Sequence, residues 1–128
     1  GDVERVTALR RAVGDDFVIH SGDDALTLAF LAMGADGVTS VASNVMPAEM
    51  VQLVAAWQAG DHAIALRLHR QLAPLFDVLF VESNPAPVKA MLHLLGRLPG
   101  ELRAPLAPLA SHNLDLVRSS VGDLQIGR

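Results

Sequence analysis

The sequence predicts an α/β fold: one arc of a larger (β/α)8 TIM barrel, with two parallel strands and their helices, followed by a C-terminal helical domain. Residues 17–44 have the pattern strand, acidic turn, helix, strand, and a β-helix-β unit joins parallel strands. Helical periodicity dominates the rest of the chain. Two parallel strands alone leave unpaired edges, and a complete barrel takes about 250 residues. We therefore expect this chain of 128 residues to be the C-terminal part of something larger, or to be completed by another chain.

The first half of the chain alternates between helices and strands. Apolar residues spaced by three or four predict the first helix, and Gly14 ends it. The turn Ser21-Gly22-Asp23-Asp24 supplies the residue types that precede a helix, and the helix after it is apolar nearly all round. The expected elements are a helix over 2–13, a strand over 17–20, a helix over 25–33, a strand over 38–41 and a helix over 44–59.

The second half is predicted to be helical, which places a domain boundary between 1–59 and 60–128. A long helix follows Asp61, and Pro74 should kink or split it. The prolines of Asn84-Pro85-Ala86-Pro87 suit the start of the next helix. Residues 96–108 are rich in proline and irregular, and a last helix runs from about 111 to 122. The apolar stripe of the long helix comprises Ile64, Leu68, Leu72, Leu75, Phe76 and Leu79.

Composition argues against several functional classes. The net charge is −4 without a basic cluster, which disfavours nucleic acid and anionic membrane surfaces as partners. No apolar run approaches transmembrane length. Cysteine is absent, so the chain offers no disulfide and no thiolate metal site. We expect a cytoplasmic protein.

Three motifs in a fixed order carry a family resemblance. They are Ser21-Gly22-Asp23-Asp24, GADGVTSVASN over 34–44, and FVESNPAPVK over 80–89. With these motifs the chain resembles the C-terminal half of the dihydrodipicolinate synthase family, class I pyruvate aldolases that include N-acetylneuraminate lyase. The segment Asn-Pro-x-Pro-Val-Lys favours the synthase branch over the sialic acid lyase branch.

The resemblance implies a lyase that condenses pyruvate with aspartate β-semialdehyde on the route to diaminopimelate and lysine. In that family a lysine forms a Schiff base with pyruvate and a tyrosine relays protons. The resemblance places both residues before Gly1. The chain has no tyrosine, and its single lysine, Lys89, sits in a predicted helix away from the strand ends. We expect no catalytic residue here, no activity of this chain alone, and a structural or solvated Lys89.

The resemblance also implies a few residues near the substrate. Gly22 would line the pyruvate pocket, and the backbone carbonyl of Thr39 would contact bound pyruvate. Asp23 and His20 are candidates for a supporting role behind them. For Asp23 and Asp24 a helix-capping role is favoured over a role in substrate binding.

No cofactor and no metal site are expected. The five histidines lack the close pairing of a zinc motif. They are His20, His62, His69, His93 and His112.

Partners and alternatives remain open at this level. The resemblance implies a homotetramer, in which Val3, Ala29 and Met33 could present an apolar face. It also implies that the missing N-terminal half of the barrel is a partner. Two other functions stay possible: another pyruvate aldolase or lyase of the family, or a non-catalytic truncated homologue that acts in assembly.

Overall fold

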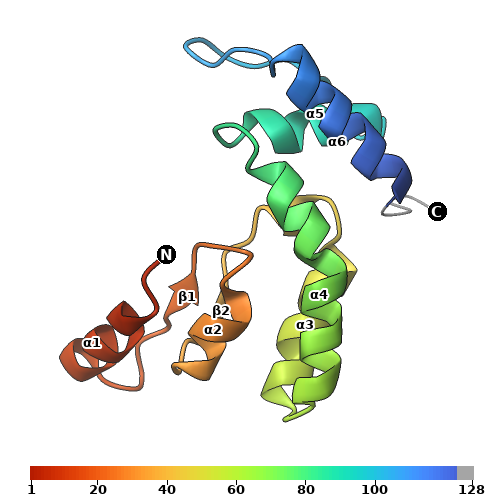
Figure 1. Cartoon of the computed structure of the whole chain (residues 1–128). Helices are drawn as coiled ribbons and strands as arrows, with labels where there is room; N and C mark the ends of the chain where they lie inside the picture. The colour runs from red at the N-terminus through yellow and green to blue at the C-terminus, as the bar shows by residue number, and fades with distance from the viewer. Residues whose placement is uncertain (124–128) are drawn as a thin grey trace.

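The computed structural model describes residues 1–123 as seven helices and two short strands. In Figure 1, α1, the strands and α2 lie side by side, α3 and α4 form a pair next to them, and α5 and α6 lie beyond one end of α4. The bounds are α1 Glu4–Val13, β1 His20–Ser21, α2 Thr27–Ala32, β2 Gly37–Val38, the 3-10 helix η1 Ala42–Asn44, α3 Pro47–Gln58, α4 His62–Leu79, α5 Ala86–Leu94 and α6 Ser111–Asp123.

The two strands are parallel, as predicted, and α2 connects them. His20 pairs with Gly37 and Ser21 with Val38. The predicted strands are too long and misplaced: β1 shares only His20 with 17–20 and extends into the predicted turn, and β2 shares only Val38 with 38–41. Each strand has only one neighbour in residues 1–123, so the ladder covers two residues of each. The outer edges of both strands therefore carry unpaired backbone groups.

The helix over 25–33 is shorter and less covered than predicted. Residues 23–27 form turns, in which the amides of Leu26 and Thr27 donate to the carbonyls of Asp23 and Asp24. Regular α-helix begins only at Thr27, and Met33 is 43% exposed. Within residues 1–123, α2 packs mainly on the two strands, α3 and α4, and Ala29, Ala32 and Met33 are exposed.

The main hydrophobic core extends along α4, which packs against α3, α5 and α6. Met50 and Leu53 of α3, Leu75 of α4, Met91 of α5 and Val117 of α6 belong to one buried cluster. This cluster spans the predicted boundary between residues 59 and 60, because α3 packs along α4. The division into two domains stays a prediction.

The structure bears on two predictions for the long helix. α4 runs unbroken from His62 to Leu79, so Pro74 does not split it, and the alternative that Pro74 kinks the helix stays a prediction. Pro74 and Arg70 are both exposed, and water can bond the carbonyl of Arg70 that the proline leaves without an N–H. Ile64 is 43% exposed while Ala65 is fully buried, so the apolar stripe begins one residue later than predicted.

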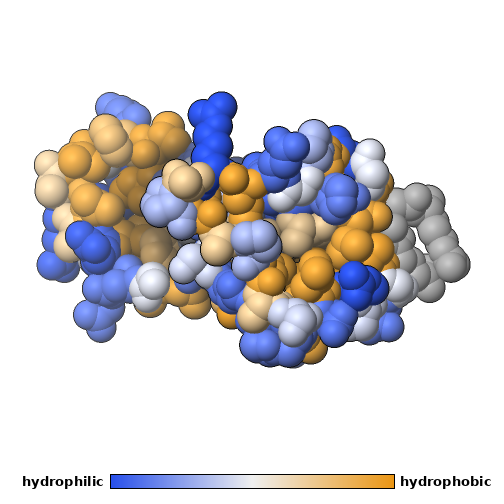
Figure 2. Space-filling view, turned by 90° about the horizontal axis from the view of Figure 1, so that it is seen from above, coloured by the Kyte–Doolittle hydropathy of each residue, from blue (hydrophilic) through white to orange (hydrophobic). Residues whose placement is uncertain are grey.

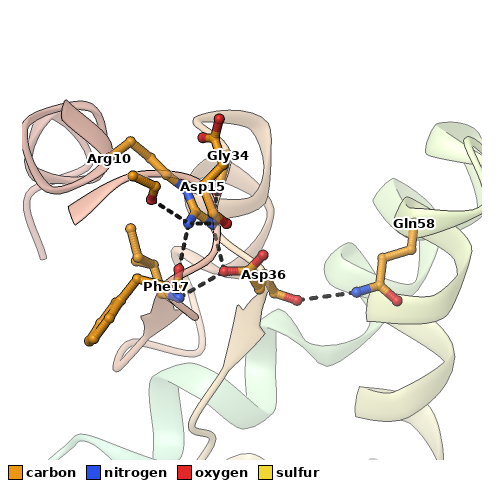
Figure 3. A network of polar contacts seen from close by, with 8 residues as sticks. Arg10, Asp15, Phe17, Gly34, Asp36 and Gln58 are labelled. Carbon is orange, nitrogen blue, oxygen red and sulfur yellow. Dashed lines mark hydrogen bonds and ion pairs between the residues drawn. The ribbon is translucent and has the colours of Figure 1, made fainter.

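A polar network joins α1 to the amino ends of the two strands (Figure 3). The guanidinium of Arg10 donates to the carbonyl of Gly34 at 2.8 Å and to the carboxylate of Asp36 at 2.6 Å. The same Asp36 oxygen accepts the Ile19 amide at 2.7 Å. In open α/β sheets ligands bind at the carboxyl ends of the strands, and this network lies at the opposite, amino ends. We therefore assign Arg10 and Asp36 to holding the fold.

The carboxylates of Asp36 and Glu82 should make the fold less stable in acid. The amide of Ile19 and the guanidinium of Arg10 lower the pKa of Asp36, and Asn113 and the amide of Ala110 lower the pKa of Glu82. In the unfolded chain these carboxyl groups have pKa values of 3.8 (Asp36) and 4.5 (Glu82). Because the pKa of each is lower in the folded state, each stabilises the fold fully above its unfolded pKa. This stabilisation is lost as the pH falls through the folded-state pKa. The melting temperature should therefore fall as pH drops below 4.5.

Thermal unfolding followed by circular dichroism from pH 7 to pH 3 would measure this fall. The double variant Asp36→Asn, Glu82→Gln should lose stability at pH 7 and show a flatter pH profile. An unchanged profile in the variant would assign the acid sensitivity to other groups.

Candidate functional site

The carboxyl ends of β1 and β2 bring Gly22 and Thr39 to the same edge of the sheet. The amide of Thr39 donates to the carbonyl of Ser21 at 2.8 Å, which continues the parallel ladder past β2. Among residues 1–123 the carbonyl of Thr39 accepts no backbone or side-chain hydrogen bond outside regular elements. Gly22 is exposed, and a Cβ built on it would meet nothing within 4 Å. Both backbones are therefore open to a ligand at the edge where α/β folds bind their substrates.

His20 and Thr39 also face each other across the two strands. Nδ1 of His20 lies 3.3 Å from the Thr39 hydroxyl. The imidazole covers Gly37, where an added Cβ would lie 3.2 Å from Nε2. His20 thus lies beside the Thr39 side chain and does not contact Gly22 through any described hydrogen bond.

The two aspartates of the acidic turn have different roles. Asp23 is half-buried and accepts the amide of Ala25 at 3.1 Å, as a local turn cap. Asp24 is 1% exposed and does not cap α2, which corrects the favoured prediction for this residue. Its Oδ2 instead accepts the amides of Val41 and Ala42, at 2.9 and 3.0 Å. The turn after Asp24 delays the start of α2 and directs the carboxylate towards η1.

Two hollows flank this edge. One of about 420 Å³ lies between the turn after β1 and the end of α4, where Gly22 and Asp23 face Phe76, Asp77 and Phe80. The other, of about 390 Å³, is a groove between β2 and α3. Its lining is mainly apolar and includes His20, Val38, Met50, Val51 and Val54.

Comparison with known proteins identifies the family. The family model described as "Dihydrodipicolinate synthetase family" matches residues 1–123. The chain belongs to this family.

Its relatives are much longer than the chain itself. A 4-hydroxy-tetrahydrodipicolinate synthase from Synechococcus elongatus is 46% identical over 124 residues, which are 97% of this chain and 42% of that protein. The synthase from Bradyrhizobium diazoefficiens is 47% identical over 117 residues, which are 91% of the chain and 40% of the relative. The chain thus spans less than half the length of these family members.

Solved structures of family members have the same fold over this region. The synthase from Methylacidiphilum fumariolicum SolV superimposes with a TM-score of 0.94 at 46% identity, covering 98% of this chain and 42% of that one. The Thermotoga maritima dihydrodipicolinate synthase superimposes with a TM-score of 0.91 at 39% identity. The match covers 97% of this chain and 43% of that one. Another solved relative is described as the first monomeric variant of dihydrodipicolinate synthase.

Lys89, the only lysine of this family member, is tied to the backbone. Its Nζ donates to the carbonyl of Glu101, and Lys89 belongs to α5. Figure 1 shows α5 at a distance from the two strands. This contact is structural. It holds the segment before α6 against α5.

The histidines do not gather into a ligand set in the described part of the chain. Within residues 1–123 no three His, Cys, Asp or Glu side chains are grouped closely enough to hold a metal ion. His62 packs on Trp57 with ring centroids 4.3 Å apart, and His69 packs on Phe76 at 5.6 Å. Burial lowers the pKa of His69. The expected absence of metal and cofactor stays a prediction for this family member.

No helix within residues 1–123 combines the length and the apolar character needed to cross a bilayer.

Sequence reasoning missed Arg10, and it named Asp24 without finding its role. Arg10 occupies a position four residues after the buried Val6, on the side of α1 that faces the strands. A charged residue in an apolar stripe is the signal that could have identified it. For Asp24 no local signal was available, since its partners are 17 and 18 residues away in the sequence.

Proposed function

We propose that this chain is the C-terminal part of a lyase that condenses pyruvate with aspartate β-semialdehyde through a lysine Schiff base, in lysine and diaminopimelate biosynthesis. The catalytic lysine and tyrosine belong to the N-terminal part of the barrel, outside this chain. The chain contributes the last arc of the barrel and the helices that follow. A cytoplasmic location and assembly into a homo-oligomer are part of the same proposal.

The observation that carries the proposal is the free carbonyl of Thr39 beside Gly22. Family resemblance assigns pyruvate contacts to these two positions, and they lie exposed at the carboxyl ends of adjacent strands. A backbone carbonyl accepts a hydrogen bond whatever its side chain. The threonine side chain at a position that is usually aliphatic in the family is therefore compatible with the contact.

The incomplete sheet supports the proposal that the remaining strands of the barrel belong to an N-terminal part outside this chain. β1 and β2 each have one neighbour in residues 1–123, and apolar side chains are exposed near them: Phe17 is 60% and Val18 64% exposed. Figure 2 shows apolar surface on the side of the molecule that holds α1 and the strands. Parallel sheets are normally buried on both faces. Further strands and helices of a barrel would cover this surface.

The test is a fusion protein in which the part of the Synechococcus elongatus synthase that precedes the matched region is joined to this chain. Incubation with pyruvate and borohydride should leave a reduced adduct on a lysine of the N-terminal part, found by intact mass and peptide mapping. The chain alone is the matched control and should not be labelled. An adduct on Lys89, or none in a folded fusion protein, would contradict the proposal.

The second substrate requires a separate assay. Condensation by the fusion protein should be faster with aspartate β-semialdehyde than with other aldehydes. A preference for another aldehyde would make this chain part of a different pyruvate aldolase. If the chain binds the separately produced N-terminal part, but neither that complex nor the fusion protein shows any turnover, the role in assembly is favoured.

A further inference from the structure

Asp24 is a buried carboxylate that connects three segments of the chain. Its Oδ2 accepts the amides of Val41 and Ala42, and its own carbonyl accepts the hydroxyl of Thr27 at 2.8 Å. Thr27 is fully buried and Asp24 is 1% exposed. A single carboxylate oxygen that accepts two successive backbone amides holds both of them at one point. The turn before α2 is therefore fixed to the backbone that follows β2.

These contacts surround the free carbonyl of Thr39. The peptide group before it is held by the hydrogen bond from the Thr39 amide to Ser21, at 2.8 Å. The peptide group after it, between Ser40 and Val41, is held by Asp24 at its N–H and by the Ser43 hydroxyl at its carbonyl, at 2.9 Å. With both neighbouring peptide groups held, the Thr39 carbonyl can change direction only by a coupled rotation about ψ of Thr39 and φ of Ser40, which allowed backbone conformations limit.

We propose that Asp24 is a positioning residue that sets the direction of the Thr39 carbonyl and through it the binding of pyruvate. The inference rests on the proposed function, since it takes the Thr39 carbonyl as a pyruvate contact. Asp24 is buried and lines neither of the two hollows beside this edge. The second carboxylate oxygen, Oδ1, is buried and has no hydrogen-bond partner among the described residues. Such an oxygen is costly to bury alone, so it is available to a donor in a completed barrel.

Glu82 is a matched control for Asp24, because it is a carboxylate that also joins distant segments but lies away from Thr39. Oε1 of Glu82 also accepts two hydrogen bonds across distant segments, from the Ala110 amide at 2.9 Å and the Asn113 side chain at 2.8 Å. Glu82 lies in the connection between α4 and α5, and its partners lie at the start of α6. Replacing Glu82 should weaken the packing of α6 and leave the direction of the Thr39 carbonyl unchanged.

The experiment compares Asp24→Ala, Asp24→Asn and Glu82→Ala in the fusion protein described above. Asp24→Ala should raise the KM for pyruvate about tenfold or more while kcat changes less. Asp24→Asn keeps an oxygen acceptor at the same place and should recover most of the affinity. Glu82→Ala should lower the melting temperature and leave the KM for pyruvate within about twofold. An unchanged KM in Asp24→Ala, or an equal rise in Glu82→Ala, would overturn the positioning role.

A crystal structure of the Asp24→Ala fusion protein separates this inference from the proposed function. The Thr39 carbonyl should point in a new direction, with the Val41 amide bonded to water. A carbonyl in its original direction would overturn the inference even if activity is lost. If the parent fusion protein binds no pyruvate, the proposed function fails, and the crystal structure still decides whether Asp24 orients the carbonyl.

Discussion

Replacing Val51 with aspartate is expected to stop this chain from assembling with the N-terminal part of a related synthase. Val51 is 68% exposed on α3 and lines the apolar groove of about 390 Å³ beside the open edge of β2. Under the proposed function, a strand and a helix of the N-terminal part fill that groove. A carboxylate buried there without a partner costs several kcal/mol. A cost of roughly 3 kcal/mol weakens association by about a hundredfold.

The measurement is a binding titration between this chain and the separately produced N-terminal part of the Synechococcus elongatus synthase. Leu116→Asp is the matched control, because Leu116 is 51% exposed on α6 and does not line the groove. It should bind like the unchanged chain. Circular dichroism should show the same helical content in both variants. Unchanged binding by Val51→Asp would place the missing part of the barrel elsewhere.

Replacing Leu79 with alanine is expected to lower the free energy of unfolding by about 3 kcal/mol. Leu79 ends α4, is fully buried, and belongs to the core cluster with Leu75, Val88 and Met91. Truncating a leucine at such a site loses its transfer free energy and leaves a cavity that the neighbours fill only in part. Leucine-to-alanine changes of this kind cost ~2–5 kcal/mol.

Urea unfolding of the fusion protein would measure the loss. Leu66→Ala is the control, since Leu66 lies on the same helix but is 42% exposed. Its cost should stay below about 1 kcal/mol, in line with the small effect of surface substitutions. Equal losses in the two variants would mean that the packing of α4 against α5 contributes little.

Helix boundaries were largely predictable, because they depend on local chemistry. Gly14 and Gly60 follow α1 and α3 with φ of 78° and 83°, a backbone conformation that glycine adopts without strain. Prolines open α3 and α5 where their missing amides cost nothing. The parallel pairing of the strands also followed from the sequence, because parallel neighbours need a crossover connection of about a dozen residues or more, usually a helix, and the segment between the strands supplies one.

The family could likewise be recognised from three short motifs, and the comparisons confirm that resemblance. Such motifs keep their residues and spacing within one chain, so no packing information is needed to identify them. The positions of Gly22 and Thr39 on one edge then followed from the strand order. Their contacts with pyruvate stay predictions.

Only the tertiary structure decided which residues support the site. The sequence alone established the helices, the parallel unit and the family, because each of these depends on residues close together in the chain. The strand ladders are shorter than predicted because pairing depends on neighbours, and each strand has one within residues 1–123. Arg10 bonds Asp36, and Asp24 bonds Val41, across 26 and 17 residues. Contacts over such separations depend on where the folded backbone brings each charge, and no local pattern specifies that.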